Sequence, residues 1–102
     1  MQQPENTITA VLEESGLTLN ELAALCAVKP DWVILHIEEG FLDPLADNQN
    51  ELRFSSASLL RAQRILQLER DFDAVPELAA LVADMQEEIS KLKHRLSSAG
   101  IE

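Results

Sequence analysis

The stretch from residue 17 to residue 40 constrains the fold most, because it contains start and stop signals for two short helices. Thr18 and Glu21 fit a capping box, in which each side chain accepts a hydrogen bond from the backbone N–H of the other residue. Pro30 suits the first turn of a second helix, where its missing N–H has no intrahelical partner, and Gly40 suits the left-handed position that ends a helix. We therefore predict two helices joined by about three residues, which is the helix-turn-helix arrangement.

The second helix of this pair has the wrong charge for reading DNA. A recognition helix needs Arg, Lys, Asn or Gln near its start to contact bases and phosphates. Residues 30–39 carry Asp31, Glu38 and Glu39 instead, and they include no Lys or Arg. The shape of a DNA-binding motif is thus combined with an anionic surface.

The net charge of −10 is concentrated in the first part of the chain. Residues 1–60 contain ten acidic and two basic residues, whereas residues 61–102 contain eight acidic and six basic residues. A negative field repels nucleic-acid phosphates and attracts basic partners. The acidity predicts either binding to a basic protein surface or simply a well-solvated face.

Short extended segments flank the helix pair. Residues 7–12 alternate and are rich in β-branched residues, which favours a strand, although they could also start a helical turn. Residues 41–44 and 51–54 are short apolar runs around a polar loop, and we predict that they pair as the hairpin of a wing.

Ser55 then caps a third helix. Its apolar stripe consists of Leu59, Leu60, Ala62, Ile65, Leu66 and Leu68, while Arg61, Arg64 and Glu69 should face water.

The last helix, which Pro76 opens, carries a heptad repeat. Its apolar positions alternate in steps of three and four residues, as in a two-stranded coil. The predicted dimerisation residues are Leu78, Val82, Met85, Ile89, Leu92 and Leu96. A helix over residues 76–98 is about 34 Å long, which exceeds what so small a domain can cover, so part of the stripe should need a partner chain. The alternative is that the helix packs only on its own domain.

Catalytic and metal-binding patterns are missing from the sequence. Cys26 is the only cysteine and lies on the apolar side of the first helix, so we expect it in the core. His36 and His94 have no triad-like pattern beside them, and His36 should be a half-exposed structural residue. We expect no enzymatic activity, no cofactor and no metal. Because no leader and no apolar run of about 18 residues is present, we expect a cytoplasmic protein.

Trp32 opens the second helix beside Asp31, where a DNA-binding protein would place polar contacts. Tryptophan is enriched among interface hot spots, so one interpretation is an anchor for a basic partner. The other is that Trp32 covers the core between the second helix and the wing.

The order of elements resembles the MerR-like winged-helix domain. The features that carry this resemblance are the helix pair, residues 40–44, a hairpin, a third helix after residues 52–55, and a long last helix. More closely, the acidic helix pair and the segments 61–69 and 75–96 are similar to the CbpM family of chaperone modulators. The expected fold is mainly α, with a tail over 1–6, a winged helix-turn-helix domain over 7–72, a C-terminal helix over 73–98 and a tail over 99–102.

The resemblance implies binding to the J-domain of a CbpA-like co-chaperone, which blocks its stimulation of Hsp70 and its DNA binding. J-domains present a basic helix to an acidic groove of Hsp70, and an acidic helical protein could occupy that helix. The predicted partner-binding residues are Glu13, Glu14, Asp31, Trp32, Leu35, Glu38 and Glu39, with a homodimer formed through the last helix. The alternatives are a MerR-type transcription regulator that binds DNA as a dimer, and a dimerisation scaffold whose heptad stripe is its whole function.

Overall fold

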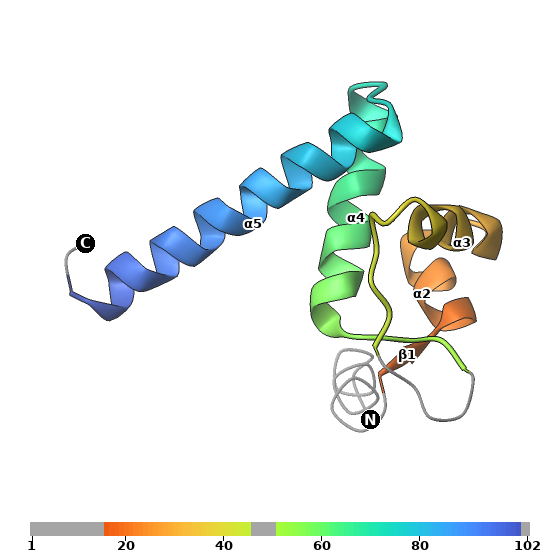
Figure 1. Ribbon diagram of the computed structural model, residues 1–102, viewed down its shortest axis with the longest axis horizontal. Coiled ribbons are helices and arrows are strands. Elements are labelled where there is room, and N and C mark those ends of the chain that lie inside the picture. Colours follow the sequence, from red (N-terminus) through yellow and green to blue (C-terminus); the bar gives the residue numbers. More distant parts are fainter. Residues whose placement is uncertain (1–15, 46–50, 101–102) are drawn as a thin grey trace, which may run out of the picture. The chain divides into compact units, whose positions relative to one another are not determined.

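The computed structural model describes residues 16–45 and 51–100, and it is mainly helical with one small antiparallel sheet (Figure 1). By its internal contacts the chain divides into two units, Met1–Gln63 and Arg64–Glu102. The elements, in chain order, are β1 (Leu17–Thr18), α2 (Leu19–Cys26), α3 (Pro30–Glu38), β2 (Arg53–Phe54), α4 (Ser56–Asp71) and α5 (Pro76–Ser98). The segment 7–12 and both predicted tails lie wholly or partly outside the described residues.

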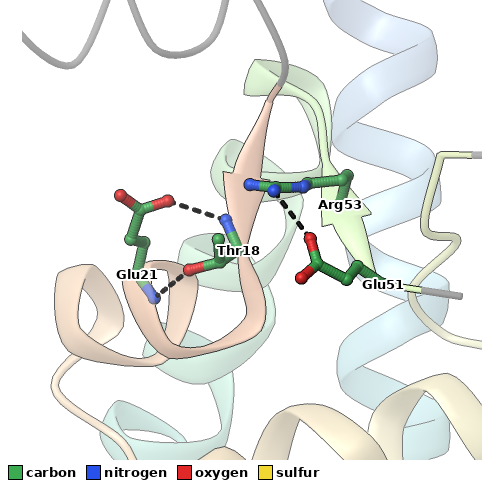
Figure 2. Close-up of polar contacts among 4 residues, drawn as sticks. All are labelled: Thr18, Glu21, Glu51 and Arg53. Carbon is green, nitrogen blue, oxygen red and sulfur yellow. Dashed lines mark hydrogen bonds and ion pairs between the residues drawn. The ribbon is translucent and has the colours of Figure 1, made fainter. Parts of the chain in front are cut away.

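The capping box at the start of α2 is confirmed (Figure 2). The Thr18 N–H donates to Oε1 of Glu21 over 2.8 Å, and the Glu21 N–H donates to Oγ1 of Thr18 over 3.1 Å. These bonds satisfy backbone donors that a helix start leaves without intrahelical partners. They also fix the direction in which the chain passes from β1 into α2.

The turn between α2 and α3 and the end of α3 follow the predicted signals. Ala27 ends α2 in the left-handed region with a φ of 56°, and Pro30 is the first residue of α3. Gly40 has a φ of 82° just after α3. There the chain reverses, and the N–H groups of Phe41 and Leu42 both donate to the carbonyl of His36, over 2.8 and 3.2 Å. Two helices that pack on each other across a short turn confirm the helix-turn-helix prediction.

The core of the first unit gathers side chains from each of its elements. Its fully or almost fully buried apolar residues are Leu17, Leu22, Ala23, Cys26, Val33, Leu42, Phe54 and Ala62. Cys26 is 5% exposed, which confirms its expected place in the core. Burying a large apolar side chain contributes about 1.5–3 kcal/mol, so this cluster holds α2, α3 and the sheet together.

The wing prediction was wrong in its strand pairing. Residues 41–44 form no strand, and β2 pairs with β1 instead, with Leu17 opposite Phe54. On the other edge of β2, within the part of the chain that the structure describes, a single bridge joins Leu45 to Arg53. The reason is the supply of backbone donors: the N–H groups of residues 41 and 42 close the end of α3, and Pro44 has none.

The start of α4 is capped as predicted, because the hydroxyl of Ser55 accepts from the Ser58 N–H over 3.1 Å. Several expectations for this helix were wrong, and Arg64 and Glu69, which were expected to face water, are half-buried. Leu60, expected in the apolar stripe, is 48% exposed. Arg61, expected to face water, is half-buried, and its Nε donates to the carbonyl of Phe41 over 2.6 Å, a backbone group that the sequence pattern does not reveal. The buried side of α4 consists of Ala62, Ile65 and Leu66.

The second unit contains the end of α4 and all of α5. The predicted break is confirmed: Asp73 adopts a φ of 53°, and the N–H groups of Phe72 and Ala74 both donate to the carbonyl of Leu68. This pattern ends a helix through a left-handed residue. The helix that follows covers Pro76–Ser98, which are the predicted bounds. Over residues 16–45 and 51–100, no helix combines the length and the apolar character that a membrane span needs.

Candidate protein-binding surface

The outward side of α3 combines apolar and acidic side chains. Four residues of α3 follow helical spacing, since the last three come three, four and seven positions after the first. They therefore lie along one side of the helix. These residues are Asp31, Ile34, Leu35 and Glu38. All four are exposed, with Ile34 at 40% and Leu35 at 50%. We call these four residues the α3 face. Two apolar side chains are thus bracketed by carboxylates over about 10 Å, the length of two helical turns.

The opposite side of α3 fixes the orientation of this face. Val33 and His36 are buried at 0% and 1% exposure, and α3 packs on α2 through this side. A rotation of the helix that buried the Asp31 carboxylate would expose Val33 to water. The local pattern of buried and exposed positions therefore determines which side chains a partner can meet.

His36 is buried, whereas we expected it to be half-exposed. Its ring stacks on Trp32 with centroids 3.8 Å apart, and Phe41 meets it edge-on at 6.1 Å. Its Nδ1 donates to the carbonyl of Trp32 over 2.7 Å. The aromatic contacts and this hydrogen bond compensate for removing the imidazole from water. Trp32 is half-buried in the stack, which gives it a packing role in α3.

The cations of the first unit do not lie on the α3 face. Among residues 16–45 and 51–63 the basic side chains are Lys29, Arg53 and Arg61. Arg53 forms an ion pair of 2.8 Å with Glu51 (Figure 2), and Arg61 is bound to a backbone carbonyl. Lys29 is exposed just before α3, one residue short of its start. The face is therefore anionic, and the positive charge of Arg53 in β2 is balanced by Glu51.

The structure places the predicted partner-binding residues in three groups. Asp31, Leu35 and Glu38 lie together on the α3 face, and Glu39 follows them, exposed at the end of the helix. Trp32 is turned towards His36. Glu13 and Glu14 lie outside the described residues. Sequence reasoning missed Ile34, although its spacing from Asp31 and Glu38 could have identified it as a neighbour of Leu35.

A second candidate surface lies on α5. The predicted heptad residues are exposed along the whole helix, except that Val82 is half-exposed. Leu78, Met85, Ile89, Leu92 and Leu96 are 50%, 57%, 50%, 46% and 43% exposed, respectively. The buried positions of α5 are three alanines, at 79, 80 and 83, which lie on another side of the helix. We call the six heptad residues the α5 stripe, and the described chain leaves it uncovered.

No three His, Cys, Asp or Glu side chains within the described ranges converge as a metal ion would require. A carboxylate-flanked apolar face suits a basic protein surface, and an apolar helical stripe suits another helix.

The chain matches a known protein family. The family model described as MerR HTH family regulatory protein matches residues 17–99, which covers both candidate surfaces. Searches of the curated proteins and of the solved structures found no match.

Proposed function

The chain belongs to the MerR HTH family of regulatory proteins, and we propose that it regulates by binding a protein instead of DNA. Its target is the J-domain of a CbpA-like co-chaperone. By occupying the basic helix of the J-domain, the protein inhibits both the stimulation of Hsp70 and the DNA binding of that co-chaperone. It acts by occupancy, without catalysis.

The observation that supports this proposal is the α3 face. In this face, Ile34 and Leu35 stand between Asp31 and Glu38 at the position that reads DNA in a helix-turn-helix protein. The carboxylates of this face would repel phosphates. A basic amphipathic helix would instead place its positive charges beside these carboxylates and its apolar side against the two apolar residues. The acidic groove of Hsp70 offers the same kind of charge, which explains how competition would arise.

A titration of the full chain with a CbpA-like J-domain tests the proposal. We expect an affinity that falls several-fold between about 0.05 M and about 0.5 M salt, because exposed charges are screened over these concentrations. Leu35→Ala should weaken binding about five- to thirtyfold, which corresponds to about 1–2 kcal/mol of apolar contact. Leu60→Ala is the matched control, since Leu60 is 48% exposed on α4, and it should bind like the wild type.

The charge contribution is tested separately with Glu38→Lys, which should weaken binding about tenfold at low salt and less at high salt. Asp71→Lys makes the same charge change at an exposed position on α4 and is the control. If the J-domain does not bind while duplex DNA binds at low salt, the protein is a MerR-type DNA-binding regulator and the proposal is wrong.

The α5 stripe supports a second part of the proposal, a homodimer. Its exposed residues recur over five turns of one helix, and covering them against a second copy would remove a long apolar surface from water. Sedimentation equilibrium should therefore give the mass of two chains. The double substitution Met85→Asp with Ile89→Asp should give a single chain that keeps its helical circular dichroism.

A further inference from the structure

The turn that joins α4 to α5 (Figure 1) carries the most exposed large apolar side chain of residues 16–45 and 51–100. Phe72 is 73% exposed there, and Val75 is 57% exposed three residues later. Asp71 and Asp73, on either side of Phe72 in the chain, are exposed as well. We call these four residues the α4–α5 corner. Aromatic side chains are enriched in protein interfaces, so a ring left in water suits a binding surface.

Hydrogen bonds hold the backbone on both sides of this ring. The N–H groups of Phe72 and Ala74 donate to the carbonyl of Leu68 over 3.1 and 3.4 Å. Beyond the turn, the carbonyl of Val75 accepts the N–H of Ala79 over 3.0 Å. The backbone is therefore already ordered, and the ring has only its two side-chain torsions to lose when a partner covers it.

Negative charge surrounds the α4–α5 corner. Residues 65–90 contain seven acidic residues, and Arg70 is their one basic residue. Besides Asp71 and Asp73, Glu77 is exposed in the first turn of α5. Such a surface repels anionic lipids and nucleic-acid phosphates, and it attracts arginine and lysine side chains.

A phenyl ring between two carboxylates suits a long basic side chain. Arginine or lysine can lay its alkyl part or its cation on the face of the ring. Because Asp71 and Asp73 are the chain neighbours of Phe72, the same basic side chain can reach a carboxylate while it covers the ring. Exposed ion pairs are weak, so removal of the ring from water has to supply much of the affinity.

The α4–α5 corner repeats the chemistry of the α3 face. Each surface combines two exposed apolar side chains with two exposed carboxylates. The two surfaces belong to different units of the chain, because Phe72 lies in the second unit. A partner that the α3 face attracts therefore meets the same kind of surface a second time.

We propose that the α4–α5 corner is a second binding site for a basic amphipathic helix, in which an arginine or lysine side chain packs on the ring of Phe72. With the J-domain as the source of that helix, this rests on the proposed function and adds to it a site in the second unit. Each chain then binds two J-domains, one at the α3 face and one at the α4–α5 corner.

Isothermal titration calorimetry of the full chain with a CbpA-like J-domain at low salt tests this inference. The wild type should bind two J-domains per chain. Phe72→Ala should weaken one of the two sites about five- to thirtyfold and leave the other unchanged, whereas Leu35→Ala should act on the other site. Leu81→Ala is the matched control, since Leu81 is 55% exposed on α5 outside both surfaces, and it should keep both sites.

The possible outcomes separate this inference from the proposed function. If one J-domain binds per chain and Phe72→Ala binds it like the wild type, the inference is wrong and the proposed function stands. If no J-domain binds, both are wrong. If Phe72→Ala leaves J-domain binding intact but weakens the homodimer in sedimentation equilibrium, a second copy of the chain covers the α4–α5 corner, which also contradicts the inference.

Discussion

Replacing Thr18 by alanine should destabilise the first unit by about 1 kcal/mol, within a range of about 0.5–2 kcal/mol for the loss of a helix N-cap. The hydroxyl of Thr18 accepts the Glu21 N–H over 3.1 Å, and the substitution leaves that donor without its acceptor. The reverse bond, from the backbone N–H of residue 18 to the Glu21 carboxylate, survives because it does not use the Thr18 side chain. Only half of the capping box is therefore lost.

Urea unfolding followed by tryptophan fluorescence measures this effect where it occurs. Trp32 is the only tryptophan of the chain, and its stacking on His36 makes its emission a probe of α3. For a domain of this size, a loss of 1 kcal/mol lowers the melting temperature by about 4 °C or slightly more. The midpoint urea concentration should fall while the slope of the transition is unchanged.

Thr18→Ser is the matched control, since serine keeps the hydroxyl and is at least as good an N-cap. It should stay within about 0.5 kcal/mol of the wild type. If Thr18→Ala were as stable as the wild type, the capping box would contribute nothing to α2. If Thr18→Ser were as damaging as Thr18→Ala, the loss would come from β1 and not from the cap.

Two further pairs of substitutions test the packing. Gly16→Ala should cost more stability than Gly40→Ala: both residues have a positive φ, but a Cβ on Gly16 would lie 2.9 Å from the carbonyl oxygen of Phe54, whereas nothing lies within 4 Å of one on Gly40. Thermal melts of the two variants should show this difference, and equal losses would contradict the packing of Gly16 against β2. Ile65→Ala should cost about 2–5 kcal/mol because Ile65 is fully buried, whereas Leu60→Ala should cost less than about 0.5 kcal/mol. Far-UV circular dichroism in urea measures both, and a similar cost for the two would refute the assignment of the buried side of α4.

The helix boundaries could be predicted from the sequence because their signals are local. Thr18, Pro30, Gly40 and Ser55 each act within one turn of the helix that they start or end, so their effect does not depend on distant parts of the chain. The same holds for the long α5, whose heptad pattern extends to Leu96. These signals predicted the mainly helical fold with its helix-turn-helix pair.

The errors arose where a hydrogen bond or an aromatic contact, and not the pattern of apolar residues, decides the conformation or the burial of a residue. The wing strand at residues 41–44 was excluded because its backbone donors close the end of α3, which the alternation of apolar residues does not show. Arg61 is half-buried because a carbonyl twenty residues earlier needs a donor. His36 is buried because its ring stacks on Trp32, four residues earlier, and meets Phe41, five residues later, edge-on.

Asp31, Leu35 and Glu38 of the α3 face were among the predicted residues, whereas Ile34 was not. The positions of the acidic residues of α3 can be read directly from the sequence, and the place of Leu35 beside them follows from the helical spacing. Ile34 has the same helical spacing and could have been included, and the buried position of Val33 confirms that Ile34 lies on the exposed side. The role of Trp32 also depends on which ring it meets, and this is a tertiary property.

The closed end of α3 has a consequence for binding. The carbonyl of His36 accepts two N–H groups, and the carbonyl of Phe41 is held by Arg61, so the backbone just beyond Glu39 is fixed by hydrogen bonds. A helix that is already held at this end loses little conformational freedom when a partner covers it. In the proposed complex, the free energy of contact at Leu35 and Glu38 then contributes to affinity, because little of it is needed to order the surface.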